Sequence, residues 1–380
     1  MIENITHNIK GLSSYKIIYN GSSSIEPTHY KGISHLIEHC MCEQIKNKFD
    51  QKFNQLAITW NASTSNQKVC FYMSGLSKYV RKNIVAFTEA IINYDIPYEV
   101  FEREKNIVIT EYYQVYTDQD NAFVLNFNRK HLNSCESIGY IEDLQNLTYE
   151  DFINYKNTVF AAPSKIIYKH AKNEKDITLN DINIPIMFND IKEYQTTYNF
   201  GEYKNYPLES YADFHNQRII CFYSILQFDN EYKNYLYSKV FNYCLTGGLN
   251  SILYKKLRDK LQCVYSISGE VVKIDNKQFG INILAHTTDD KKEIVLKNLK
   301  KSISTIQPKL TKKLFNDCIK LFKNSYKISN ILNWENIISD EALKCRELVL
   351  NKQYSYEEFK FFANTILNSN VLYITDEQYV

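Results

Sequence analysis

Strand-like and helix-like segments follow one another in a similar order in the two halves of this 380-residue chain. In each half, short apolar runs typical of buried strands lie among longer segments whose apolar side chains recur at helical spacing. Between about residues 170 and 205 the periodicity is lost and the sequence becomes polar, as expected where one domain hands over to the next. We therefore expect an α+β protein with two similar αβ domains, residues 1–190 and 191–380.

Six segments have the short apolar pattern of strands: residues 15–19, 68–74, 164–168, 218–224, 264–272 and 278–285. Helical spacing of apolar side chains covers residues 80–94, 98–116, 230–244 and 249–261. Further helices are expected to begin near His35, Thr148, Lys291, Thr311 and Ile338, with Ser34 able to cap the first.

Charge and cysteine content narrow the class of protein. With 45 basic and 43 acidic side chains, the chain lacks the basic surplus that usually accompanies nucleic-acid binding. Its N-terminus has neither a basic nor an apolar secretory region, and no apolar run approaches the roughly 18 residues of a membrane span. The nine cysteines are odd in number and scattered, which favours reduced, buried thiols over a disulfide framework or a cysteine metal site. We expect a cytoplasmic protein that binds neither nucleic acid nor membrane.

The most informative motif is His35-Leu36-Ile37-Glu38-His39. On a helix, His35 and His39 are four residues apart, so both imidazoles project from one face and can bind one zinc ion. Glu38 lies on the same side, placed to take a proton from a metal-bound water. This H-x-x-E-H order is the inverse of the common zinc-protease motif. The alternative interpretation is two helix histidines beside a glutamate that forms an ordinary salt bridge.

Two histidines are an incomplete catalytic zinc site, because such a site generally takes three protein ligands. The helix expected from Tyr98 carries Glu104 and Glu111, which are two turns apart and therefore face the same way. One of these carboxylates can bind the metal while the other fixes a histidine ring.

These residues resemble the pitrilysin family of zinc peptidases, which includes insulin-degrading enzyme and the mitochondrial processing peptidase. The resemblance extends from about Tyr19 to at least Ser268, because further segments occur in the family's order. These segments are Asn61-Ala62-Ser63-Thr64-Ser65, Pro97, Gly139-Tyr140, Leu147-Thr148-Tyr149-Glu150-Asp151, Gly247-Gly248-Leu249-Asn250-Ser251-Ile252-Leu253, Lys256-Leu257-Arg258-Asp259-Lys260 and Val264-Tyr265-Ser266.

The resemblance implies a zinc endopeptidase that cuts peptides or unstructured protein segments. His35, His39 and Glu111 would hold Zn²⁺, Glu104 would support a ligand, and Glu38 would be the general base that activates a zinc-bound water. Asn61 and Ala62 would bind substrate as an added strand, while Arg258 and Tyr265 would stabilise the substrate carbonyl and the oxyanion. By themselves, Arg258 fits a surface salt bridge and Tyr265 a core aromatic.

The family fold also implies a mainly antiparallel sheet packed with helices in each domain, the two together forming one half of a clam-shell chamber. A homodimer, or a heterodimer with a related chain, would then supply the second half. The sequence departs from the family at three places: the N-terminal strand is expected to be reduced, Thr59-Trp60 replaces glycines, and Gln262-Cys263 replaces Gly-Leu. Two competing interpretations are a catalytically silent structural or partner subunit of this fold and a metal-binding protein of unrelated fold.

Overall fold

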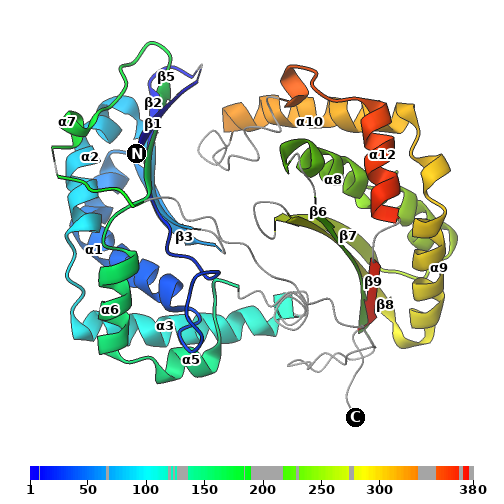
Figure 1. Cartoon of the computed structure of the whole chain (residues 1–380), viewed down its shortest axis with the longest axis horizontal. Helices are drawn as coiled ribbons and strands as arrows, with labels where there is room; N and C mark the ends of the chain where they lie inside the picture. Colours follow the sequence, from blue (N-terminus) through cyan, green and yellow to red (C-terminus); the bar gives the residue numbers. More distant parts are fainter. Residues whose placement is uncertain are drawn as a thin grey trace. The chain divides into compact units, whose positions relative to one another are not determined.

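The computed structural model describes residues 1–7, 9–65, 68–118, 121–122, 125, 136–183, 185–189, 217–227, 231–273, 278–332, 348–367 and 371–375. The chain divides into two compact units, Met1–Asn199 and Phe200–Val380, which are coloured along the sequence in Figure 1. The expected domain boundary between residues 190 and 191 lies outside the described residues.

Unit 1 contains a five-stranded sheet in the order β1-β5-β2-β4-β3. Its strands are β1 Ile2–His7, β2 Leu12–Tyr19, β3 Thr59–Thr64, β4 Val69–Leu76 and β5 Lys165–Ala171. Neighbours are antiparallel except for β1 and β5, which are parallel. The central strand β2 is buried almost throughout, while β3 alternates exposed and half-buried side chains as an edge strand does.

The helices of unit 1 are α1 Ile33–Gln55, α2 Ser77–Ile92, α3 Tyr98–Thr117, α5 Ile141–Asn146, α6 Tyr149–Val159 and α7 Leu179–Ile182. Helices α1 and α2 lie against the same face of the sheet, and α3 runs beside α1 (Figure 1). Ile37 and Phe53 of α1, Phe87 of α2 and Phe71 of β4 are buried in one core. This packing fixes α1 between the sheet and α3, so that side chains from both helices can meet.

Unit 2 contains an antiparallel four-stranded sheet in the order β7-β8-β6-β9. Its strands are β6 Gln217–Gln227, β7 Ser266–Lys273, β8 Gln278–Thr288 and β9 Val371–Thr375. Its helices are α8 Glu231–Thr246, the π-helix η1 Tyr254–Lys260, α9 Lys292–Ser304, α10 Lys312–Leu332 and α12 Tyr356–Leu367, with 3₁₀ turns at Asp289–Lys291 and Gln307–Lys309. Helix α8 packs on β7 and β8, and α10 and α12 pack on α8.

The expected α+β class, with a mainly antiparallel sheet in each of two units, is confirmed. The N-terminal strand, which we expected in reduced form, is β1; it spans six residues and pairs with β5 along its length. This partner lies some 160 residues away in the sequence, so local periodicity gives little sign of the strand. The helix expected from Ile338 begins outside the described residues. Among the described helices, none is long and apolar enough to cross a membrane.

Candidate active site

The two histidines and Glu38 lie in the first two turns of α1. Gly32 precedes this helix with φ 103°, a left-handed conformation that favours glycine. The expected cap by Ser34 is wrong, because no side chain of the N-cap residue forms a capping hydrogen bond and Ser34 lies inside the helix. Instead, the backbone N–H groups of Gly32 and Ser34 each donate to the buried carboxylate of Glu26 at 2.8 Å. Glu26 therefore fixes the start of the helix immediately before His35.

Helix α3 brings both of its glutamates to the histidines. The Glu111 Oε2 atom lies 3.4 Å from His39 Nε2 and 3.8 Å from His35 Nε2. One donor atom from each of His35, His39 and Glu111 lies within 4.8 Å of the others. Two imidazole nitrogens and one carboxylate oxygen are therefore gathered at one point.

This donor set fits a catalytic zinc ion in type and size. Ligand atoms bound to tetrahedral zinc at about 2.0–2.2 Å are separated by about 3.3–3.5 Å, close to the two distances measured to Glu111. Two histidines and one carboxylate also match a catalytic site that leaves one position for water. Glu111 is 40% exposed at its side chain, so the group of donor atoms is open to solvent on the side of this carboxylate.

Glu104 lies behind His39. Its Oε2 atom is 3.6 Å from His39 Nδ1, the ring nitrogen that does not face Glu111. The other oxygen accepts a hydrogen bond from Arg103 Nε at 3.1 Å, and Arg103 also pairs with Glu43 at 2.8 Å. A carboxylate beside the second ring nitrogen is the arrangement in which supporting carboxylates orient histidine ligands at metal sites.

The charges of these groups follow from burial and from their neighbours. Burial and the neighbouring His39 together lower the pKa of His35 to about 4. Burial also disfavours the charged form of His39, but the carboxylates of Glu111, Glu38 and Glu104 together outweigh it and raise its pKa. The hydrogen bond with His39 lowers the pKa of Glu111. The shifts at His35 and Glu111 favour the neutral imidazole and the ionised carboxylate that bind a metal ion, whereas His39, with its raised pKa, has to lose a proton to bind one.

Glu38 lies in the second turn of α1, close enough to His39 and Glu111 for their charges to affect it, and is held by β3. Thr64 Oγ1 donates a hydrogen bond to Glu38 Oε2 at 2.7 Å. Burial raises the pKa of Glu38, while the Thr64 hydrogen bond opposes that rise. A fixed, buried carboxylate of raised basicity is suited to general-base catalysis.

The predicted substrate-binding residues lie on the edge strand. Asn61 is exposed and Ala62 is half-buried on β3, which pairs with β4 on one side only. The Ala62 N–H donates to Asn61 Oδ1 at 2.9 Å. Peptides that bind by strand addition pair with the backbone of an exposed edge strand of this kind.

The predicted pair in unit 2 is also brought together. Arg258 lies on η1, and its guanidinium stands 5.5 Å from the ring centre of Tyr254 and 5.4 Å from that of Tyr265. Tyr265 is 79% exposed, so the interpretation of it as a core aromatic is wrong. These cation–π contacts with two rings hold Arg258 beside an exposed phenol.

Three residues around the site were given no role by the sequence. Thr64 lies within the Asn61–Ser65 segment, which did give a signal. Glu26 and Arg103 gave none, because their roles depend on contacts made after the loop and helices have packed.

Fold and site together define the class of protein: a peptidase-like fold that carries an inverted H-x-x-E-H motif. A sequence model described as insulinase, peptidase family M16, matches residues 7–139, and one described as the peptidase M16 inactive domain matches residues 177–322. The chain belongs to peptidase family M16, and the resemblance seen in the sequence is confirmed.

Individual relatives are distant in sequence. A probable mitochondrial-processing peptidase subunit beta of Schizosaccharomyces pombe is 21% identical over 159 residues, which cover 39% of this chain and 34% of that protein. A protease from Helicobacter pylori has the same fold, with a TM-score of 0.75 and 14% identity over 98% of this chain and 96% of its own. The periplasmic protease PqqL of Escherichia coli has a TM-score of 0.69 and 15% identity, and here 99% of this chain covers 46% of the other.

Proposed function

We propose that this protein is a zinc-dependent endopeptidase that hydrolyses peptides or unstructured protein segments. The observation that carries the proposal is the meeting of His35, His39 and Glu111 with Glu38, which Thr64 holds beside them. His35, His39 and Glu111 would hold the zinc ion, and Glu104 would orient His39. When bound, zinc would act as a Lewis acid that lowers the pKa of water and polarises the scissile carbonyl.

The remaining steps belong to side chains of this chain. A substrate would add as a strand along β3, where Asn61 and Ala62 are accessible. Glu38 would take the proton of the attacking water and deliver it to the leaving amine. Arg258 and Tyr265 would donate to the substrate carbonyl and to the oxyanion that forms from it.

We also propose that two chains form the working peptidase, either as a homodimer or with a related chain. PqqL holds in one chain about twice the length matched here, which supports an assembly of two such halves. The zinc residues of one protomer would then work with Arg258 and Tyr265 of its partner. Six cysteines have side chains that the structure describes; they are free and five of them are buried, which supports our proposal of a protein of the reducing cytoplasm.

Chelation and zinc readdition test the activity. We expect a pool of unstructured peptides to be cleaved by the zinc-loaded protein, cleavage to stop with a chelator, and zinc to restore it. Glu111→Gln should lose both zinc and cleavage. Full zinc binding without any cleavage would favour the alternative of a catalytically silent subunit, for which the match of residues 177–322 to the inactive-domain model is the supporting observation.

Mixing two inactive variants tests the assembly. Glu38→Gln lacks the base, and Arg258→Ala lacks the guanidinium. If the two groups act across a dimer, random re-association restores about a quarter of the wild-type sites, since half of the dimers are mixed and each holds one intact site. No recovery, or an active monomer in light scattering, would rule out the shared site.

A further inference from the structure

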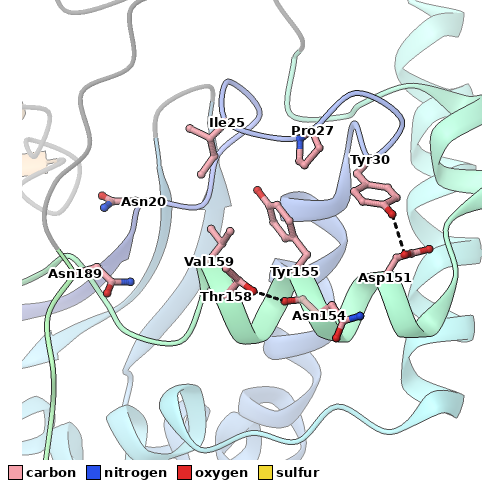
Figure 2. A pocket seen from close by; sticks show the side chains of 10 residues that line it. All are labelled: Asn20, Ile25, Pro27, Tyr30, Asp151, Asn154, Tyr155, Thr158, Val159 and Asn189. Atoms are coloured by element: carbon pink, nitrogen blue, oxygen red, sulfur yellow. Dashed lines mark hydrogen bonds between the residues drawn. The ribbon is translucent and has the colours of Figure 1, made fainter.

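A pocket of about 790 Å³ in unit 1 is lined by none of the residues assigned above. Figure 2 shows it between the loop that follows β2 and one face of α6. Ile25, Pro27 and Tyr30 line the loop side, and Asp151, Tyr155 and Val159 line the helix side. Its volume lies within the roughly 300–1,000 Å³ of small-molecule sites.

The charge of the lining favours a cation. Asp151 is the one carboxylate among the described residues that line the pocket, and no lysine, arginine or histidine is among them. The other polar groups are amides, hydroxyls and phenols, of which Asn20, Asn154 and Asn189 provide amide oxygens. An anion would meet an unbalanced negative charge here, whereas a cation would neutralise it.

Asp151 is ionised and retains capacity to accept hydrogen bonds. Tyr30 OH donates to its Oδ1 atom at 2.8 Å, and Thr148 Oγ1 donates to its Oδ2 atom. The hydrogen bonds from Thr148 and Tyr30 lower the pKa of Asp151. An ionised carboxylate has about four lone-pair positions, so these two side-chain donors leave room for an N–H donor of a ligand.

The rest of the pocket suits an apolar stem beside that charge. In Figure 2 the ring of Tyr155 rises from α6 toward the loop, with Val159 on the helix and Ile25 and Pro27 on the loop around the same space. The Tyr30 ring stands over Asp151 at one end. Aromatic faces attract amine and guanidinium groups, and the aliphatic side chains accommodate methylene groups. We propose that this pocket binds an organic cation, an amine or a guanidinium group on an apolar stem.

The loop that lines one side of the pocket also fixes the start of α1, the helix that carries His35 and His39. Between Ile25 and Pro27 lies Glu26, whose carboxylate receives the N–H groups of Gly32 and Ser34. On the other wall, Tyr155 OH lies 3.4 Å from Ser34 Oγ. A ligand that contacts both the loop and α6 would therefore also affect Ser34, the residue before His35. We expect such a ligand to change the rate of peptide cleavage. That consequence rests on the proposed peptidase function, whereas binding itself does not.

Binding is tested by isothermal titration of the full chain with two cations, n-butylguanidinium and the peptide acetyl-Gly-Arg-Gly-amide. Binding of the first alone identifies a free small cation as the ligand class, and binding of the second identifies an arginine side chain. n-Butylurea and the corresponding citrulline peptide, which lack the positive charge, should not bind. If neither cation binds at millimolar concentration, or if the uncharged controls bind equally well, the proposal is overturned.

Variants place the bound cation in the pocket. Asp151→Asn should weaken binding by about tenfold or more, since a charge-assisted hydrogen bond is lost. Glu150→Gln is the matched control, because it removes one negative charge from the same turn of α6 outside the lining, and it should change affinity less than about twofold. Thr158→Trp, at an exposed lining position, should block binding in a folded protein even if Asp151→Asn disturbs the helix start. Unchanged affinity in Thr158→Trp would refute this location, and this result can be read even in a protein that cleaves no peptide.

Discussion

Replacing Thr64 by valine isolates the contact that holds the proposed general base. Valine has nearly the same shape as threonine but lacks the hydroxyl, so β3 and its pairing with β4 should remain. The Glu38 carboxylate then loses the 2.7 Å hydrogen bond from Thr64 Oγ1. Since Glu38 is only 8% exposed, water replaces that donor poorly.

The size of the effect follows from the kind of hydrogen bond. A hydrogen bond to a charged group contributes about 1.5–3 kcal/mol. If the whole of this free energy serves to orient Glu38 in the transition state, its loss lowers kcat by about 10- to 150-fold. Zinc content should stay at the wild-type level, because Thr64 touches none of the three proposed zinc ligands in the described contacts.

The assay compares kcat and KM for one cleaved peptide in wild type, Thr64→Val and Thr64→Ser, with zinc measured in each. Thr64→Ser keeps the hydroxyl and should recover most of the activity. The reasoning is refuted if Thr64→Val cleaves like wild type, or if Thr64→Ser is as impaired as Thr64→Val while both remain folded and zinc-loaded.

Three further predictions concern groups around the site. Glu104→Gln should weaken zinc binding about 10- to 100-fold, as measured by competition with a chelator, while Glu102→Gln at a half-buried position of the same helix should not. Burial raises the pKa of Glu26 from its usual 4.5 to about 7, so the contribution of Glu26 to stability is complete below about pH 4.5 and is lost as the pH rises to 7. At about 1.36 kcal/mol per pH unit, the difference in unfolding free energy between wild type and Glu26→Gln should shrink by about 3 kcal/mol across that range. Urea titrations at several pH values measure this difference, and a constant difference would contradict the prediction. Gln262 has φ 50°, where glycine is favoured, and Gln262→Gly should therefore raise the unfolding free energy by about 1 kcal/mol, whereas a fall would show that its side chain matters more than its backbone.

The sequence predicted those parts of the molecule that depend on local spacing. His35, Glu38 and His39 share one helix face, and the two-turn spacing of Glu104 and Glu111 directs both toward that face, so each could be placed before any tertiary contact was known. Glu26, by contrast, acts on α1 from a preceding loop, and β1 owes its conformation to pairing with β5. Such contacts follow from the packed fold and leave no periodic trace. The choice of Glu111 over Glu104 as metal ligand came from family resemblance, and the structure gives it a physical basis, since Glu111 faces the Nε2 atoms of both histidines.

The central claim is that Glu38 performs the chemistry at a zinc site formed by His35, His39 and Glu111. Its most direct test is the cleavage of a peptide library by wild type and Glu38→Gln, with zinc measured in both proteins. We expect Glu38→Gln to retain one zinc per chain and to lose cleavage by a factor of about 10² or more, because the substitution removes the base and preserves the metal-binding residues. Equal cleavage by the two zinc-loaded proteins would contradict the mechanism.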